Sequence, residues 1–227
     1  MASLLRRLAS YLVPFVVKEA ESTVSPGLEV IYSGGSYLLH SRRTNYSEGE
    51  LKEVFHRTFR ALGVYHRPMQ TVLVLGLGAG SIVRLLAARG RRPAVTGVEL
   101  DPKVIELGKA YFGLDRHPNL QIVEADAATY LQQQQGRYDL VCVDVFVDEL
   151  VPEAMDQLAV IEACKRALAP GGLLIWNRLV HTEQTKTRTE HFLQAFGLIF
   201  PHHHIRQMRT NWIVIAEQPD AVHTETT

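Results

Sequence analysis

A regular alternation of apolar runs and helical patterns, which starts at residue 71, constrains the fold more than any other feature of this sequence. Runs typical of strands occupy residues 71–75, 95–100, 120–126, 138–144 and 172–177. Strands this rich in apolar residues are typical of a parallel sheet that is covered on both faces. The alternation therefore predicts an α/β fold with helices on both faces of a parallel sheet.

The last part of the chain breaks this alternation. After a predicted helix at 185–196, two runs of strand type at 202–208 and 212–216 are joined by Arg209-Thr-Asn. So short a link allows a hairpin but no helical crossover. A parallel sheet that ends in an antiparallel hairpin is the layout of Rossmann-like methyltransferases, whereas dinucleotide-binding domains usually close with another parallel strand.

The first 45 residues follow a different pattern. Leucines on one helical face predict a short amphipathic helix, and three short runs of strand type follow at 15–20, 28–32 and 37–40. Turn sequences separate these runs, so we expect a small antiparallel meander. We therefore divide the chain into an N-terminal helix and meander at 1–45, a main domain at 46–217 and a flexible tail at 218–227.

The charge balance argues against two classes of partner. Lys and Arg together number 24, as do Asp and Glu, so the formal net charge is zero. We expect neither nucleic acid nor a membrane as a partner, because nothing in this balance attracts polyanions and no run of about 18 apolar residues is present. The apolar stretch at 8–17 is interrupted by Pro14 and has no cleavage signal after it, so we expect a cytoplasmic protein.

A glycine-rich loop marks the expected ligand site. Gly76-Leu-Gly-Ala-Gly lies between a strand and a helix, where missing Cβ atoms let backbone amides approach a ligand. Glu99 ends the second strand and Asp126 ends the third, both at the carboxyl edge of the sheet. A carboxylate in the first place suits the two hydroxyls of a ribose, and one in the second suits an adenine amino group. Either acid can instead cap the helix that follows it.

Asp144 ends the fourth strand above the same crevice, where a carboxylate can serve as a general base. Capping of local amides is its structural alternative. Tyr46, Asp148 and Glu149 are candidate contacts of an acceptor substrate, with ordinary loop positions as the alternative. No metal site is expected, because neighbouring residues of His202-His-His point to opposite faces of a strand. The candidate cofactor-binding residues are Gly76, Leu77, Gly78, Gly80, Glu99, Leu100, Asp126, Ala127 and Asp144.

A nicotinamide dinucleotide is a less favoured ligand. Its fingerprint requires a third glycine where this chain has Ser81, and it offers no reason for Asp126 or for the final hairpin.

Five segments resemble the spermidine synthase (polyamine aminopropyltransferase) family, in the same order along the chain. They are Val72-Leu-Val-Leu-Gly-Leu-Gly-Ala-Gly, Val98-Glu-Leu-Asp-Pro-Lys-Val-Ile-Glu, Val123-Glu-Ala-Asp-Ala, Tyr138-Asp-Leu-Val-Cys-Val-Asp and Leu168-Ala-Pro-Gly-Gly. The resemblance covers about residues 46–180 and implies a seven-stranded, Rossmann-like methyltransferase fold behind an N-terminal β-domain, usually in a homodimer. It also implies that the loop glycines line a nucleoside, that Glu99 holds its ribose and Asp126 its adenine, and that Asp144 is the catalytic acid-base.

Three departures from the family pattern bear on the reaction. Aminopropyltransferases carry an acid in the glycine loop that holds the amine of decarboxylated S-adenosylmethionine, and Ala79 stands at that position. The family has two acids three apart and then a proline after the fourth strand, whereas Asp144 and Asp148 are four apart and Glu149 follows. The segment 50–56, which aligns with the family's tyrosine-rich gate, lacks the aromatic residue of that gate.

These features leave three functions open. The departures favour a transferase that uses S-adenosylmethionine itself and passes its methyl group to an unidentified small molecule by in-line displacement. The second function is a true polyamine aminopropyltransferase that uses the decarboxylated compound. The third is a nucleoside-binding module without catalysis.

Overall fold

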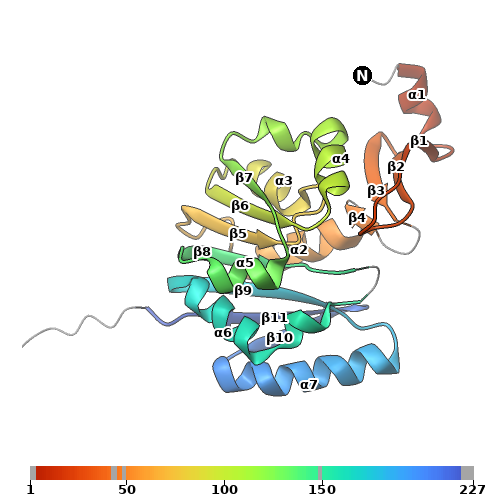
Figure 1. The fold of residues 1–227 in the computed structure, drawn as a ribbon. Coiled ribbons are helices and arrows are strands. Elements are labelled where there is room, and N and C mark those ends of the chain that lie inside the picture. The colour runs from red at the N-terminus through yellow and green to blue at the C-terminus, as the bar shows by residue number, and fades with distance from the viewer. Residues whose placement is uncertain (1–3, 42–44, 48–49, 148–149, 221–227) are drawn as a thin grey trace, which may run out of the picture.

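The computed structural model describes residues 4–41, 45–47, 50–147 and 150–220. These residues form a seven-stranded sheet and a separate four-stranded sheet (Figure 1). The large sheet has the strand order β10-β11-β9-β8-β5-β6-β7. Its strands are β5 (Thr71–Leu75), β6 (Ala94–Glu99), β7 (Leu120–Glu124), β8 (Tyr138–Val143), β9 (Leu168–Leu179), β10 (His204–Met208) and β11 (Asn211–Glu217).

The strand directions of the large sheet confirm the predicted fold. β5 to β9 pair in parallel, and the β10–β11 hairpin adds to β9 in antiparallel orientation. From β5 the chain builds outward through β6 and β7 and then crosses back to place β8 on the other side of β5. The carboxyl ends of β5 and β8 therefore border the crevice in which α/β sheets of this kind usually bind ligands.

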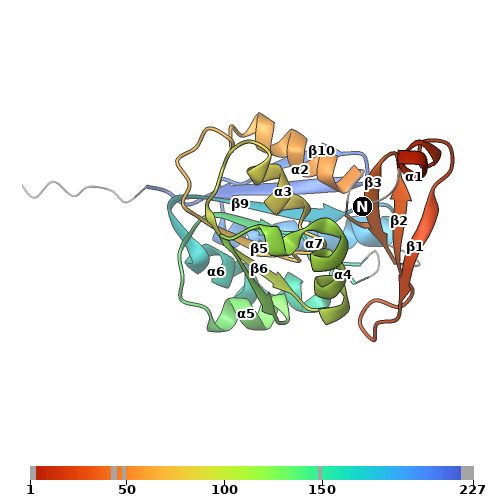
Figure 2. The same cartoon turned by 90° about the horizontal axis from the view of Figure 1, so that it is seen from above.

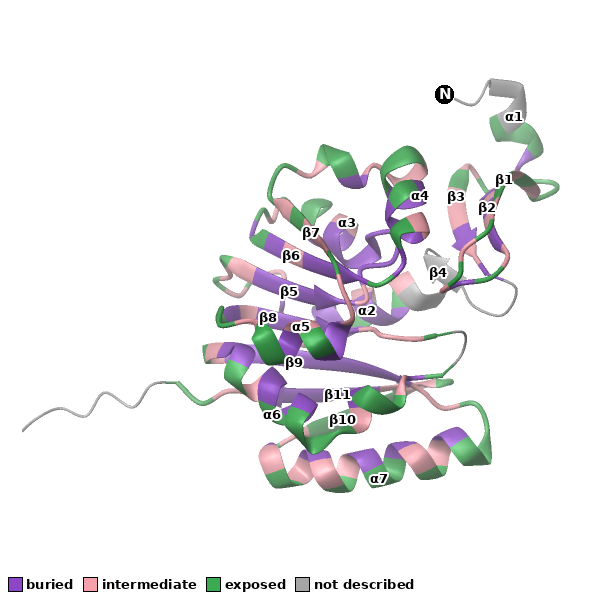
Figure 3. Cartoon of the chain, viewed as in Figure 1, coloured by how far each residue is buried: buried purple, intermediate pink, exposed green. Residues whose placement is uncertain are grey.

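Helices cover both faces of the large sheet, as predicted. They are α2 (Glu50–Ala61), α3 (Ser81–Ala87), α4 (Pro102–Phe112), α5 (Ala127–Gln133), α6 (Leu158–Ala167) and α7 (Glu183–Ile199), with two short 3-10 helices, η1 (Leu114–Arg116) and η2 (Glu153–Asp156). α2 and α3 pack with Val72 and Val74 on one face, and α5, α6 and α7 pack with Leu73 and Leu75 on the other. Figure 3 shows the central strands buried along most of their length. None of the described helices is long and apolar enough to cross a membrane.

One predicted helix is interrupted. The pattern at 153–168 suggests a single long helix, but the structure has η2 and then α6, with Gln157 in an extended conformation between them. The side chain of Asp156 explains the break, because it binds Arg178 of β9 and Arg188 of α7 and so holds this segment against the sheet.

The four-stranded sheet stands at one end of the large sheet, beside α4 (Figure 2). Its antiparallel strands follow chain order and are β1 (Phe15–Ala20), β2 (Leu28–Ser33), β3 (Ser36–His40) and β4 (Asn45–Ser47), after the short helix α1 (Leu4–Ala9). The first three strands agree with the predicted meander, and β4 was not predicted. Leu28, Val30 and Leu39 are fully buried and pack with Ala79, Val104 and Leu107. This apolar cluster, which we call the inter-sheet cluster, fixes the small sheet next to the glycine loop.

Candidate active site

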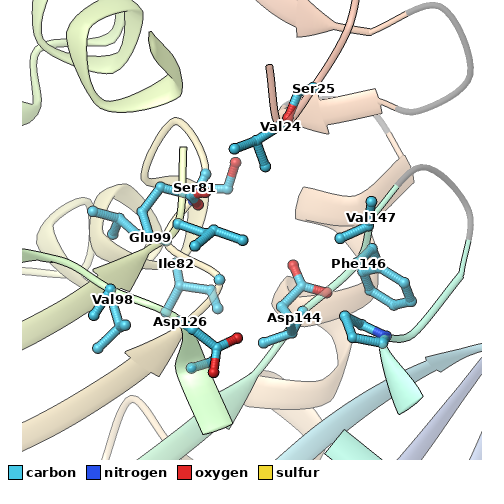
Figure 4. Close-up of a pocket in the computed structure, with 18 of the residues that line it drawn as sticks. Val24, Ser25, Ser81, Ile82, Val98, Glu99, Asp126, Asp144, Phe146 and Val147 are labelled. Carbon is cyan, nitrogen blue, oxygen red and sulfur yellow. The ribbon is translucent and has the colours of Figure 1, made fainter. Parts of the chain in front are cut away.

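A pocket lies at the carboxyl edge of the large sheet, between the ends of β5, β6 and β8 and the small sheet (Figure 4). Most of the predicted cofactor-binding residues line it. They are Gly76, Leu77, Gly78, Glu99, Leu100, Asp126, Ala127 and Asp144. Gly80 does not line the pocket and instead lies at the N-terminal end of α3.

The glycine loop is held by backbone contacts that exclude side chains. The amides of Gly76 and Leu77 both donate to the carbonyl oxygen of Val98, at 2.9 Å. Gly76 has a φ of 78°, and a Cβ there would lie 2.2 Å from the carbonyl oxygen of Asp144. Gly80 has a φ of 84°, and its Cβ would collide with Leu114. The loop therefore needs glycine at both positions, because other residues would be strained and would clash.

Glu99 is buried and joins the glycine loop to β6. Its Oε2 accepts a hydrogen bond of 2.8 Å from the amide of Gly78, and its Oε1 accepts one of 3.1 Å from the amide of Asp101. Burial raises the pKa of the Glu99 carboxyl, and these two backbone hydrogen bonds oppose that rise. Each carboxylate oxygen can accept a second hydrogen bond. Glu99 can therefore clamp the loop and still receive two ligand hydroxyls.

Asp126 combines the two roles that its position allows. Its Oδ1 accepts hydrogen bonds of 2.8 Å from both the amide and the hydroxyl of Thr129, so the residue caps α5. Its side chain also lines the pocket. Its other oxygen, Oδ2, has no hydrogen bond within the described part of the chain, so it is available to a ligand donor.

Asp144 follows β8 directly and lies across the pocket from Glu99 (Figure 4). Its Oδ1 accepts a hydrogen bond of 2.9 Å from Nδ2 of Asn177 in β9. Burial raises the pKa of Asp144 to about 7, the Asn177 hydrogen bond opposes that rise, and the negative charge of Glu99 adds to it. A carboxyl group with this pKa can exchange a proton near neutral pH.

The three predicted acceptor contacts are not placed by the structure. Asp148 and Glu149 lie outside the described residues. Tyr46 belongs to β4, but its side chain is also outside the described part.

The pocket also contains residues that the sequence analysis missed. Phe55 of α2 is 1% exposed and lines the pocket, although it was expected only as a core residue. The segment 50–56, which lacks the aromatic residue of the family's gate, therefore contributes this ring to the site instead. Its helical spacing marked Phe55 as a core residue, and no local signal distinguishes a core ring from a pocket ring. The other missed lining residues include Val24, Ser25, Phe146, Val147 and Pro152.

The loop between β1 and β2 forms the wall that the small sheet contributes. Val24 and Ser25 lie at the top of the pocket in Figure 4. Ser22 in the same loop donates a hydrogen bond of 2.7 Å to Oδ2 of Asp101, whose Oδ1 caps α4. One buried carboxylate, Asp101, therefore links this loop to the segment that follows Glu99.

The charge of the pocket is negative. Its described lining residues include three carboxylates, Glu99, Asp126 and Asp144, and no Lys, Arg or His. No group of three or more His, Cys, Asp or Glu in the described residues is arranged to hold a metal ion. An acidic lining of this kind attracts positively charged groups.

Comparisons with known proteins agree with this architecture. Residues 72–172 match the model of a methyltransferase domain. Over 126 residues the chain is 31% identical to a polyamine aminopropyltransferase of Chromobacterium violaceum, and the match covers 55% of this chain and 48% of that protein. The chain thus spans about half the length of this curated relative.

Solved structures show the same fold. A probable spermidine synthase from Corynebacterium glutamicum superposes with a TM-score of 0.74 at 20% identity, over 95% of this chain and 84% of that one. Human methyltransferase-like protein 13, in complex with SAH, superposes with a TM-score of 0.61 at 22% identity, over 76% of this chain and 84% of that one. The chain is therefore similar in sequence to a polyamine aminopropyltransferase over about half of that protein's length, and it shares the fold of solved spermidine synthases and methyltransferases.

Proposed function

We propose that the chain binds an adenosyl sulfonium compound in this pocket and transfers a group from it to a small-molecule acceptor. Methyl transfer from S-adenosylmethionine is the reaction that the site favours. The proposal goes beyond the family, because relatives with this fold carry the names of both aminopropyltransferases and methyltransferases.

The side of the pocket at β6 and α5 fits the nucleoside. Glu99 lines the pocket and accepts from the backbone amides of Gly78 and Asp101, and its carboxylate oxygens have further lone pairs for ribose hydroxyls. The Oδ2 atom of Asp126 can accept from an amino group such as that of adenine. Gly76 and Gly78 line the pocket and carry no side chain, so a ligand can approach the backbone closely there. A sulfonium cation would also meet favourable charge, since the described lining is acidic.

The position of Ala79 is the observation that favours methyl over aminopropyl transfer. The family resemblance implies an acid at this position, where it holds the amine of the decarboxylated donor. In this chain Ala79 is fully buried in the inter-sheet cluster, among side chains such as Val30 and Leu107. Apolar packing therefore stands where the family has a fixed carboxylate. The ammonium group of the decarboxylated donor would move from water into the pocket without an opposite charge to compensate it.

The acceptor side of the pocket supports the same choice. Phe146 and Val147 lie beside Asp144 in Figure 4, and Phe55 and Pro152 also line the pocket. Asp144 is the one carboxylate among these described residues. It can take a proton from a single nucleophile, whereas a diamine would bring a second ammonium that needs its own carboxylate. The site therefore fits an acceptor with one nucleophilic group on an apolar body.

The transfer is a displacement in line with the bond that breaks. S-adenosylmethionine supplies an electrophilic methyl carbon bound to a positively charged sulfur. The acceptor donates an electron pair to that carbon, the carbon–sulfur bond breaks, and its electron pair stays on the sulfur of S-adenosylhomocysteine. Asp144 receives the proton that the acceptor loses. The remaining task of the chain is alignment of the two reactants.

Aminopropyl transfer is the second candidate, and one observation favours it. A lining of three acids and no base suits the decarboxylated donor, which lacks the carboxylate of S-adenosylmethionine. The name of the Chromobacterium relative points the same way.

Calorimetry separates the two transfer reactions by their donors, and a turnover screen then separates both from binding without catalysis. The purified chain is titrated in turn with S-adenosylmethionine, its decarboxylated form, methylthioadenosine and NAD. We expect binding of the first and third, weaker binding of the second and no binding of NAD. A screen of amines, small acids and phenols that follows release of S-adenosylhomocysteine then identifies the acceptor. Conversion of putrescine and the decarboxylated donor to spermidine at ordinary enzymatic rates would establish the second candidate instead.

A further inference from the structure

Two asparagines behind the pocket connect Asp144 to the C-terminal hairpin. Asn177 lies in β9 with 1% of its surface exposed, and its Nδ2 donates to Oδ1 of Asp144 at 2.9 Å. Asn211 begins β11, and its Nδ2 donates to Oδ1 of Asn177 at 3.0 Å. These bonds form an unbroken chain of side chains from the hairpin to the pocket.

The antiparallel register brings the two amides together. Asn177 pairs with Ile213 across the β9–β11 ladder, so Asn211, two residues before Ile213, points to the same face of the sheet. Diagonal neighbours of this kind are close enough for amide side chains to meet. The tight turn between β10 and β11, in which Arg209 has a φ of 49°, sets where Asn211 begins its strand.

The hydrogen bond from Asn211 to Asn177 determines which end of the Asn177 amide faces Asp144. A side-chain amide has a donor end and an acceptor end, and it can face a neighbour with either one. Asn211 supplies a donor to the oxygen of Asn177, which leaves the NH₂ group of Asn177 toward Asp144. With the opposite orientation, two oxygens would face each other at Asp144 and two donors would face each other at Asn211.

We propose that Asn177 is a positioning residue for Asp144, and that Asn211 fixes which end of the Asn177 amide faces it. The pair holds Oδ1 of Asp144 and leaves Oδ2 for the acceptor, so that one defined oxygen receives the proton. Only the description of Asp144 as a base rests on the proposed function; the hydrogen-bond chain does not.

Several ionisable groups lie around Asp144 and Asn211 and bear on the pKa of Asp144. Glu99 faces Asp144 across the pocket, and its negative charge opposes ionisation of Asp144. The thiol of Cys142, buried on β8, is the second ionisable neighbour. Asn211 borders a groove between α2 and the hairpin that also contains Glu53, Arg57 and Arg209. Asn177 counteracts burial by stabilising the Asp144 carboxylate, so its loss must raise the pKa of Asp144.

Carbon-13 NMR of the full chain, labelled at its Asp carboxyl carbons, measures this pKa without any substrate. The Asp144→Asn variant assigns the signal. We expect Asn177→Leu to raise the pKa of Asp144 by roughly one pH unit, and Asn211→Ala to raise it by a smaller amount. Asn119→Leu is the matched control, because Asn119 is exposed and donates to the carbonyl of Arg92 at the opposite edge of the sheet. It should leave the pKa unchanged.

The possible results test the hydrogen-bond chain and the proposed transferase function separately. Circular dichroism checks folding, and Asn211→Ala, at a half-buried position, carries the test if Asn177→Leu does not fold. An unchanged Asp144 pKa in folded Asn211→Ala would overturn the role of Asn211, and the same result in Asn177→Leu would overturn the whole inference. If the pKa moves but the parent chain binds no sulfonium compound in calorimetry, the hydrogen-bond chain stands and the proposed function fails.

Kinetics give a further readout once an acceptor is known. A base must be ionised, so the rate should rise with pH through the pKa of Asp144. Asn211→Ala should move this rise to higher pH and lower kcat at pH 7 by roughly twofold, with nucleoside affinity retained. A fall in kcat with an unshifted pH profile would contradict a positioning role.

Discussion

The two sides of the pocket are built in different ways. The side that we propose for the nucleoside, here called the nucleoside side, consists of strand ends and first helical turns. Its central carboxylate, Glu99, is held by backbone amides. The side that we propose for the acceptor, here called the acceptor side, consists of side chains from α2, the loop after β8 and the β1–β2 loop, and its carboxylate, Asp144, is held by the side chain of Asn177. Backbone amides are present whatever the side chains are. The nucleoside side is thus a property of the fold, whereas the acceptor side is a property of this particular chain.

The largest expected effect concerns the acceptor side. Asp144→Asn keeps the shape of the side chain and removes the base, so kcat should fall by about 10²–10⁴-fold. Affinity for S-adenosylhomocysteine should change little, because Glu99 and the glycine loop are untouched. Steady-state kinetics and calorimetry measure the two effects separately, with Asp115→Asn, an exposed acid of η1, as the control. Turnover at the parent rate would make Asp144 structural.

The next effect tests the junction between the small sheet and the glycine loop. Ala79→Asp places a carboxylate without a partner in the inter-sheet cluster, where Ala79 is fully buried. We expect a loss of about 2–4 kcal/mol in the free energy of unfolding, or roughly 5–15 °C in Tm.

Thermal melting compares this variant with Ala110→Asp, an exposed site on α4. The loss should be larger at pH 8 than at pH 5, since the buried acid is ionised more fully at the higher pH. A stable Ala79→Asp protein that prefers the decarboxylated donor would show that position 79 faces the ligand, and would favour aminopropyl chemistry.

On the nucleoside side, Glu99→Ala removes the acceptor for two ribose hydroxyls and for two backbone amides. This change should cost about 1–3 kcal/mol of binding free energy, which is a tenfold or greater loss of affinity. Glu124→Ala, an exposed acid at the paired position of β7, is the control. Calorimetry with S-adenosylmethionine and methylthioadenosine measures both variants, and undiminished binding to Glu99→Ala would place the nucleoside elsewhere.

The raised pKa of Asp144 also affects stability. Its folded-state pKa of about 7 exceeds the ordinary value of 3.8, so its contribution to stability is greatest at low pH and is lost as pH rises toward 7. Asp144→Asn removes this loss. We therefore expect the stability of the variant relative to the parent to increase as the pH rises from 4 to 7. At pH 8 the gain should be on the order of a few kcal/mol, or roughly 10 °C in Tm. Parallel melting curves at pH 5 and pH 8 test this, and an equal difference at both would contradict it.

The smallest effect tests how the β1–β2 loop closes the pocket. Ser22→Ala removes its hydrogen bond to Asp101 and should weaken nucleoside binding by about 0.5–1.5 kcal/mol, or roughly two- to tenfold. Ser33→Ala, at the other turn of the small sheet, is the matched control for calorimetry. A loss equal to that of Glu99→Ala would mean that the two sides of the pocket are not independent.

Much of the fold and of the nucleoside side could be predicted from the sequence. The alternation after residue 71 reflects strands buried on both faces, and this periodicity is local. Glu99 ends β6 and Asp126 follows the end of β7 by two residues, so their positions at one edge followed from the topology alone. The break at Gln157 could not be predicted, because the ion pairs of Asp156 that impose it come from β9 and α7.

The sequence by itself determined the parallel sheet, its antiparallel end and the acids at its carboxyl edge, since each depends on neighbours within a few residues. Only the tertiary structure decided that Phe55 lines the pocket, that Ala79 belongs to an apolar cluster and that Asn211 meets Asn177 behind Asp144. Those contacts join segments far apart in the chain, and no local periodicity encodes a distance across a sheet or between two sheets. Helical spacing places a ring on the inner face of α2, but whether that face meets a core or a cavity depends on what packs opposite it.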